Sequence, residues 1–281
     1  MTYADIFLHL DNSDGAEKRV DYALALAKDQ NAHLTGYAIS ATPAAMSYGI
    51  APVPLEMVTM QQEIARGEAE LAIKNFEKRA DQSEQPSETL TMTGVIGLAI
   101  RELAMDTRHA DLMITGQPLP ETGGYSIHRQ LIEEMLFSAG RPVLVVPYIG
   151  ANAVPPKNVL VAWDGSREVT QAVHDALPLL RKADRVTIMV VDPDKRPDRH
   201  GEEPGANIGR HLARHGLDVT VAQEVSAGLH IGEFLISRIA DGGHDLLVMG
   251  GYSHSRLREM ILGGVTRTLL DSMTVPVFLS H

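Results

Sequence analysis

The chain has 281 residues, of which 44% are hydrophobic and 22% charged, with a formal net charge of −11 and no cysteine. This length favours two domains, each long enough to bury its own core. The composition excludes disulfides, thiolate metal sites and a cysteine nucleophile, and the acidic balance argues against a nucleic-acid partner.

The sequence also gives no sign of a membrane partner. No apolar run reaches the roughly 18–20 residues that cross a bilayer. The first residues lack the basic segment that precedes the apolar part of a secretory signal. We therefore expect a cytoplasmic protein.

The first predicted strand, residues 5–10, ends in Asp11-Asn-Ser13, and a helical pattern follows it. A loop rich in Pro, Ala and Met comes next, over residues 40–54. A long helical stretch over residues 55–79 follows this loop. The apolar positions from Met60 to Phe76 are amphipathic, which favours packing on the core; a groove for a partner is the alternative.

Two further apolar runs, residues 110–116 and 143–146, follow the long helical stretch. Gly and Pro between residues 147 and 156 then interrupt regular structure. We place a first domain at residues 1–148, a linker at 149–156 and a second domain at 157–281.

The second domain repeats the first. Asp164-Gly-Ser166 closes its first strand as Asp11-Asn-Ser13 does, at an offset of 153 residues, whereas Gly250 corresponds to Gly116 at an offset of 134. The first copy therefore carries about 19 extra residues, in the loop and the long helix. The predicted strands of the second copy are 158–163, 186–191, 217–223, 245–250 and 275–279, and its helices are 167–182, 205–215, 229–241 and 262–272.

The runs over residues 186–191 and 246–249 are continuously apolar, as expected for strands of a parallel sheet covered by helices on both faces. Alternating strands and helices predict two tandem doubly wound α/β domains. Ligands of such sheets bind at the carboxyl ends of the strands, which makes Asp11 and Asp164 candidate site residues. Capping of the following helix is the simpler explanation of Asp-x-Ser, and the two do not exclude each other.

The segment from Gly250 to Val265 leaves a strand, passes through a polar loop and enters a helix behind two glycines, Gly263 and Gly264. Glycines let backbone N–H groups approach an anion, and a helix N-terminus adds partial positive charge. This pattern predicts a phosphate cradle without a Walker lysine.

The segment resembles the signature of universal stress proteins, Gly-x2-Gly-x9-Gly-Ser/Thr, which belong to the adenine-nucleotide α-hydrolase-like folds. The resemblance covers the second copy, with Asp164-Gly-Ser166. It implies an ATP or AMP site, with Mg²⁺, in the C-terminal domain. The implied cofactor-binding residues are Asp164, Val190, Gly250, Ser253, His254, Ser255, Gly263 and Gly264.

Two positions depart from the signature. Ser253 replaces its second glycine, and Gly264 replaces its final Ser/Thr. The Ser253 hydroxyl and the side chains of His254 and Ser255 are candidates for replacement phosphate contacts.

The first copy departs further. Leu119 replaces the second glycine, and Arg129-Gln130 replace the glycine pair, so side chains are expected where phosphate needs bare backbone. We expect no conventional ATP site there. The loop over residues 40–54 and the long helix are expected to cover the site or to form a more apolar pocket.

No catalytic set is identified, and we expect slow ATP hydrolysis at most. The predicted role is signalling or protection in the stress response. The alternatives are a nucleotide-independent small-molecule or partner-binding module that uses the N-terminal domain, and a nucleotidyl-transfer enzyme. His211 and His215, spaced i, i+4, lie among basic residues, so no metal site is predicted.

Both copies end in a β-branched strand. The last strands of universal stress proteins pair antiparallel across a dimer, which implies an intramolecular pseudo-dimer in a fused chain. Such pairing would hide the edge that each sheet otherwise exposes. A further homodimer is left open.

Overall fold

The structure is a computed structural model, and it describes residues 2–42, 54–118, 127–149, 154–195, 197–251 and 264–281. Of the helices in these ranges, none combines the length and the apolar character that crossing a bilayer requires.

The N-terminal half alternates strands and helices. Its elements are β1 (Asp5–Leu10), α1 (Ala16–Gln30), β2 (His33–Thr42), α2 (Leu55–Ser83), β3 (Ser87–Val95), α3 (Ile96–Thr107), β4 (Leu112–Gly116), α4 (Ile127–Glu134), the π-helical turn η1 (Met135–Ala139) and β5 (Val143–Val146).

The C-terminal half repeats this order with shorter connections. Its elements are β6 (Asn158–Ala162), α5 (Arg167–Asp175), α6 (Leu177–Leu180), β7 (Arg185–Val191), the 3₁₀ turn η2 (Pro193–Lys195), α7 (Pro197–His200), α8 (Ala206–Arg214), β8 (Val219–Glu224), α9 (Ile231–Asp241), β9 (Leu246–Gly250), α10 (Gly264–Ser272) and β10 (Val277–Ser280).

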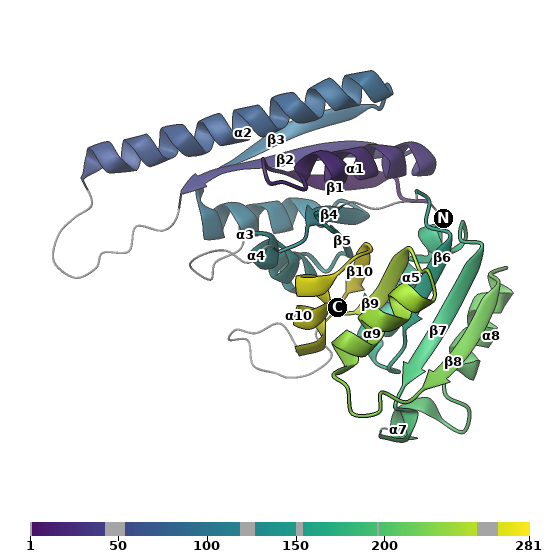
Figure 1. The fold of residues 1–281 in the computed structure, drawn as a ribbon. Coiled ribbons are helices and arrows are strands. Elements are labelled where there is room, and N and C mark those ends of the chain that lie inside the picture. The colour runs from purple at the N-terminus through teal and green to yellow at the C-terminus, as the bar shows by residue number, and fades with distance from the viewer. Residues whose placement is uncertain (1, 43–53, 119–126, 150–153, 196, 252–263) are drawn as a thin grey trace.

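All ten strands form one sheet in the order β3-β2-β1-β4-β5-β10-β9-β6-β7-β8, which Figure 1 shows running from one half into the other. Neighbouring strands are parallel within each half. At the centre β5 and β10 pair antiparallel, with Leu144 opposite Phe278. The predicted pairing of the two last strands is therefore confirmed, and it joins the halves within one chain.

Helices cover both faces of this sheet. One apolar cluster packs beneath α1, α2, α5, α6 and α8, and the other beneath α3, α4, α9 and α10. Each cluster contains residues of both halves. Polar contacts also cross between them: Lys182 Nζ lies 2.9 Å from Asp29 Oδ2, and Gln117 Nε2 donates to the carbonyl of Leu270 at 3.0 Å.

Two helices differ from their predictions. The expected helix over residues 167–182 is divided at Ala176 into α5 and α6, because Pro178 occupies the first turn of α6 and cannot donate a backbone hydrogen bond. Helix α2 lies at the outer end of the N-terminal half (Figure 1). It buries Ala69, Ala72, Phe76 and Ala80, whereas Met60 is 62% exposed. The prediction that the apolar positions pack on the core was therefore wrong for the first turns of α2.

Candidate functional site

Both halves place a carboxylate where the strand order reverses. In the N-terminal half Asp11 follows β1 beside β4, and in the C-terminal half Asp164 follows β6 beside β9. The carboxyl ends of parallel strands at such a reversal form the usual ligand crevice of doubly wound folds. The two positions are topologically equivalent, but their surroundings differ.

In the C-terminal half Asp164 has one oxygen in the local turn and one facing outward. Its Oδ1 accepts the Ser166 N–H at 3.0 Å, and Ser166 Oγ accepts the Val169 N–H at 3.3 Å, which caps α5. Its Oδ2 lies 3.5 Å from Arg199 Nη1, and the Asp164 side chain is 40% exposed. The local turn and helix cap therefore account for Ser166 and for Asp164 Oδ1, but not for Asp164 Oδ2.

Gly250 has a packing role at the end of β9. A Cβ atom there would lie 2.6 Å from the backbone nitrogen of Val169, so the first turn of α5 can approach only a glycine. Val190 lies in β7, the strand on the other side of β6, and its side chain is fully buried. Only the backbone of Val190 is therefore available to a ligand.

Gly264 is the first residue of α10, and a Cβ atom there would lie 3.4 Å from His230 Nε2. The other predicted loop residues, Ser253, His254, Ser255 and Gly263, lie outside the described residues, as does Leu119 of the first copy. Of the predicted residues, the sheet thus places Asp164, Val190 and Gly250 at the ends or edges of three neighbouring strands.

In the N-terminal half the equivalent carboxylate is surrounded by the chain's own side chains. Asp11 Oδ1 accepts hydrogen bonds from the Ser13 N–H at 3.0 Å, from Ser13 Oγ at 2.7 Å and from Arg19 Nη2 at 2.7 Å. Asp11 Oδ2 lies 2.5 Å from His128 Nε2 and 3.6 Å from His9 Nδ1. These residues come from β1, the β1–α1 loop, α1 and α4.

Burial and charge act in opposite directions on these groups. Burial alone would raise the pKa of Asp11, but the hydrogen bond from His128 and the charge of Arg19 hold that pKa well below its usual range. Burial lowers the pKa of His9 to about 3, despite the attraction of Asp11, so its imidazole is neutral near pH 7. The cluster therefore contains an ionised carboxylate beside a neutral imidazole.

Ser13 corresponds to Ser166, which bonds Asp164 in the same way, but the histidine and arginine partners of Asp11 have no counterparts in the second copy. At the offset that relates Asp11 to Asp164, His9 corresponds to Ala162 and Arg19 to Ala172. Arg19 and His128 also occupy the space above Gly116 that a Cβ atom there would need. The same edge of the sheet is thus filled in the N-terminal half, and the Asp164 side chain is more exposed than that of Asp11, which is 23% exposed.

Side chains were expected at this edge, but Arg129, one of those predicted, pairs elsewhere, and Leu119 lies outside the described residues. Arg129 forms an ion pair with Asp271 of the C-terminal half at 2.9 Å, and it is the preceding residue, His128, that meets Asp11. The helical spacing of the buried positions along α4 is the signal that distinguishes them: His128 is buried with Leu131 and Ile132, three and four residues further on.

Among the described residues, two of the cavities border the N-terminal half. One of about 320 Å³ lies between α1 and α2, next to Asp11, and is lined by both polar and apolar groups, including Asp14, Glu17 and Leu71. The expectation of a more apolar pocket in this half stays a prediction. Residues 43–53, most of the expected cover, lie outside the described residues.

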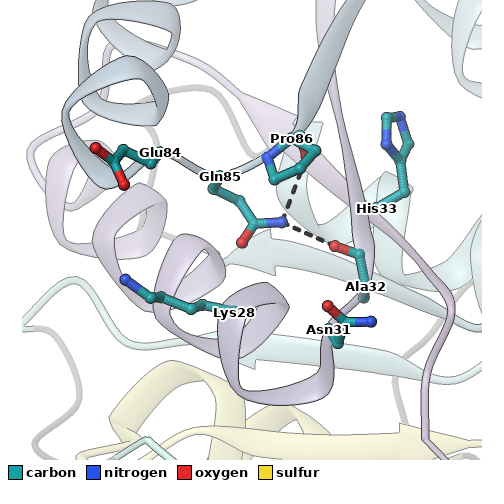
Figure 2. Close-up of a pocket in the computed structure, with 7 residues that line it drawn as sticks. All are labelled: Lys28, Asn31, Ala32, His33, Glu84, Gln85 and Pro86. Atoms are coloured by element: carbon teal, nitrogen blue, oxygen red, sulfur yellow. Dashed lines mark hydrogen bonds between the residues drawn. The ribbon is translucent and has the colours of Figure 1, made fainter.

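The second cavity, of about 310 Å³, lies at the opposite edge of the sheet, where β2 begins at His33 (Figure 2). Figure 2 shows Gln85 bridging the turn by donating to the carbonyls of Ala32 and Pro86, at 2.8 and 3.4 Å. The amide of Gln85 is thus committed to holding the two chain segments together. We therefore interpret this cavity as a by-product of the turn that Gln85 holds together, rather than as a binding site.

Comparisons with known proteins agree with this architecture. Residues 156–281 match the Universal stress protein family. A universal stress protein of Synechocystis sp. is 28% identical over 149 residues, which are 52% of this chain and 49% of that protein, so the match spans about half of this curated relative.

Two solved structures share the fold over nearly the whole chain. A universal stress protein from Archaeoglobus fulgidus DSM 4304 has a TM-score of 0.67 at 17% identity, covering 98% of this chain and 95% of that one. A putative universal stress protein from Pseudomonas aeruginosa UCBPP-PA14 has a TM-score of 0.61 at 12% identity, covering 99% and 93%. Residues 156–281 therefore match the universal stress protein family, and the chain as a whole shares the fold of these solved structures.

Proposed function

We propose that the C-terminal half binds an adenine nucleotide, ATP with Mg²⁺ or AMP, and that the chain is a cytoplasmic stress-response protein. Its role is signalling or protection rather than catalysis. Occupancy would act by stabilising the arrangement of the chain that binds the nucleotide more tightly.

The Asp164 carboxylate carries this proposal, because its side chain is 40% exposed although Oδ2 forms an ion pair with Arg199. A ribose hydroxyl can donate to Asp164 Oδ2, whose described neighbour, Arg199 Nη1, lies at the long distance of 3.5 Å. The N-terminus of α10 at Gly264 supplies partial positive charge suited to a phosphate group. The same proposal excludes the N-terminal half, where the equivalent carboxylate, Asp11, is already bonded to Ser13, Arg19 and His128.

The test follows thermal unfolding of the purified chain during titration with ATP–Mg²⁺ and with AMP. A ligand that binds the folded chain stabilises it by about 2.7 kcal/mol at 100 times its Kd. We expect such a rise for the natural chain and its loss for Asp164→Ala. Asp184→Ala is the matched control, because Asp184 is an exposed carboxylate just before β7, at the other edge of the sheet.

The nucleotide proposal is wrong if neither nucleotide raises the unfolding temperature, or if the rise is the same in Asp164→Ala. A second candidate function then takes its place: nucleotide-independent binding of a small molecule or partner by the N-terminal half. The cavity beside Asp11 favours that candidate. It predicts that Leu71→Trp, on the cavity wall, abolishes binding while Asp184→Ala retains it.

A further inference from the structure

We propose that the N-terminal half binds one divalent transition-metal ion, with the chemistry of Zn²⁺, through His9 Nδ1, Asp11 Oδ2 and His128 Nε2. These three atoms all lie within 4.8 Å of one another. They belong to β1, to the residue just after β1, and to α4, so the sheet and one covering helix hold them in place.

The spacing of the three atoms suits a small ion. Zinc binds histidine nitrogen and carboxylate oxygen at about 2.0–2.2 Å in a tetrahedral arrangement, which puts neighbouring ligand atoms roughly 3.3 Å apart. His9 Nδ1 lies 3.6 Å and His128 Nε2 lies 2.5 Å from Asp11 Oδ2. An ion would therefore need the second pair to open by less than about 1 Å.

A buried polar atom without a partner points to the same place. His9 is 3% exposed, and its Nδ1 has no hydrogen-bond partner among the described residues. Thr115 Oγ1, fully buried, also has none there. Leu8 of β1 is opposite Ile114 of β4, so His9 and Thr115 are the next residues of the two neighbouring strands. Such buried groups are usually satisfied by an ion or an ordered water.

The surrounding hydrogen bonds resemble the outer shell of a metal site. Ser13 and Arg19 donate to Asp11 Oδ1, which leaves Oδ2 to face the two imidazoles. Arg19 Nε also donates to the carbonyl of His9 at 3.2 Å. Hydrogen bonds of this kind orient the carboxylate and the backbone of a ligand before the ion arrives. The Arg19 charge is committed to the other oxygen, so the ion would share the carboxylate with it.

The donor set selects the class of ion. Two imidazole nitrogens and one carboxylate oxygen suit zinc and its neighbours, whereas Mg²⁺ and Ca²⁺ prefer oxygen ligands alone. Three protein ligands leave a fourth position for water or a small anion. The metal site is separate from the proposed nucleotide site, because its three ligands all belong to the N-terminal half. The C-terminal half has Ala162 at the position equivalent to His9.

The experiment uses the full chain, freed of metal with a chelator and carrying no histidine tag. Zn²⁺ alone is titrated by calorimetry, and Co²⁺ is used for its visible absorption, which strengthens in tetrahedral sites. We expect one ion per chain. His128→Gln and His9→Gln should each weaken binding by more than about 100-fold, beyond the loss typical of outer-shell changes.

His211→Gln is the matched control, since the rings of His211 and His215 lie 4.8 Å apart on the C-terminal half and could bind metal adventitiously. This variant should bind Zn²⁺ as the natural chain does. Thermal unfolding in chelator identifies any variant that fails to fold, and His128→Gln tests the site independently of the more buried His9.

The proposal is overturned if the natural chain binds no stoichiometric Zn²⁺ or Co²⁺. It is also overturned if binding survives in folded His128→Gln, or if it is lost in His211→Gln instead. Nucleotide titration of the same samples keeps this result separate from the function proposed for the C-terminal half.

Discussion

At the residue scale, the ion pair between Arg19 and Asp11 is largely removed from water: the Arg19 side chain is 2% exposed. Removing one partner of a buried pair leaves an uncompensated charge, which costs about 3–5 kcal/mol. We expect Arg19→Met, which fills much of the same volume, to lower the free energy of unfolding by about this amount in urea denaturation.

Arg79→Met provides the comparison, because Arg79 pairs with the exposed carboxylates of Glu17 and Asp21. Exposed pairs contribute about 0–1 kcal/mol. Equal effects of the two substitutions would contradict the buried, structural role assigned to Arg19.

Two glycines test whether Gly250 is needed for packing. A Cβ atom at Gly250 would collide with the backbone at Val169, whereas one at Gly67, within α2, would meet nothing within 4 Å. Gly250→Ala should therefore destabilise the chain by about 1–3 kcal/mol. Gly67→Ala should stabilise it by about 0.5–1 kcal/mol, as in other helix interiors. Urea denaturation without nucleotide measures both, and an unchanged stability of Gly250→Ala would rule out the packing explanation.

The sequence allowed only part of the candidate site to be predicted. Asp11 and Asp164 could be identified because each directly ends an apolar strand, and strand order then brings them to the crevice. His9, Arg19 and His128 could not be connected, because His128 is 119 residues from His9 and spacing rules apply within one element. Only the packing of α4 on β4, the strand next to β1, brings the two histidines together.

At the scale of elements, prediction succeeded where one local pattern decides the outcome. Short apolar runs marked the strands of the C-terminal half to within about two residues, including the partly exposed edge strand β8. The extent of burial along α2 was not predictable, because an amphipathic pattern does not tell how far the neighbouring sheet reaches. Ile64, in the predicted apolar stripe, is 55% exposed, whereas Phe76 is fully buried.

Substitutions at the start of α5 can distinguish the capping of this helix from the proposed binding of a nucleotide. Ser166 Oγ accepts the Val169 N–H, and loss of such a cap costs about 1 kcal/mol. Ser166→Ala should lower the free energy of unfolding by this amount and leave the ATP-dependent rise in unfolding temperature intact, unlike Asp164→Ala. Thermal unfolding with and without ATP measures both effects. Loss of the ATP-dependent rise in Ser166→Ala would show that the turn as a whole, rather than the Asp164 carboxylate, holds the nucleotide.

At the scale of the whole molecule, the central pairing of β5 with β10 determines how the chain unfolds. Separate domains commonly unfold in separate steps. Here one sheet and two apolar clusters extend through both halves, so neither half can open without exposing the core of the other. We therefore expect one cooperative transition, with equal calorimetric and van't Hoff enthalpies.

Phe278→Ala tests this coupling, because Phe278 is fully buried in β10 opposite Leu144 of β5. Truncating a buried Phe costs about 3–5 kcal/mol, and a coupled molecule must show that loss as a shift of its single transition to lower temperature. Leu98→Ala, at an exposed position of α3, should shift the transition little. If calorimetry instead shows two transitions, of which only one moves in Phe278→Ala, the halves are independent folding units and the shared sheet does not couple them.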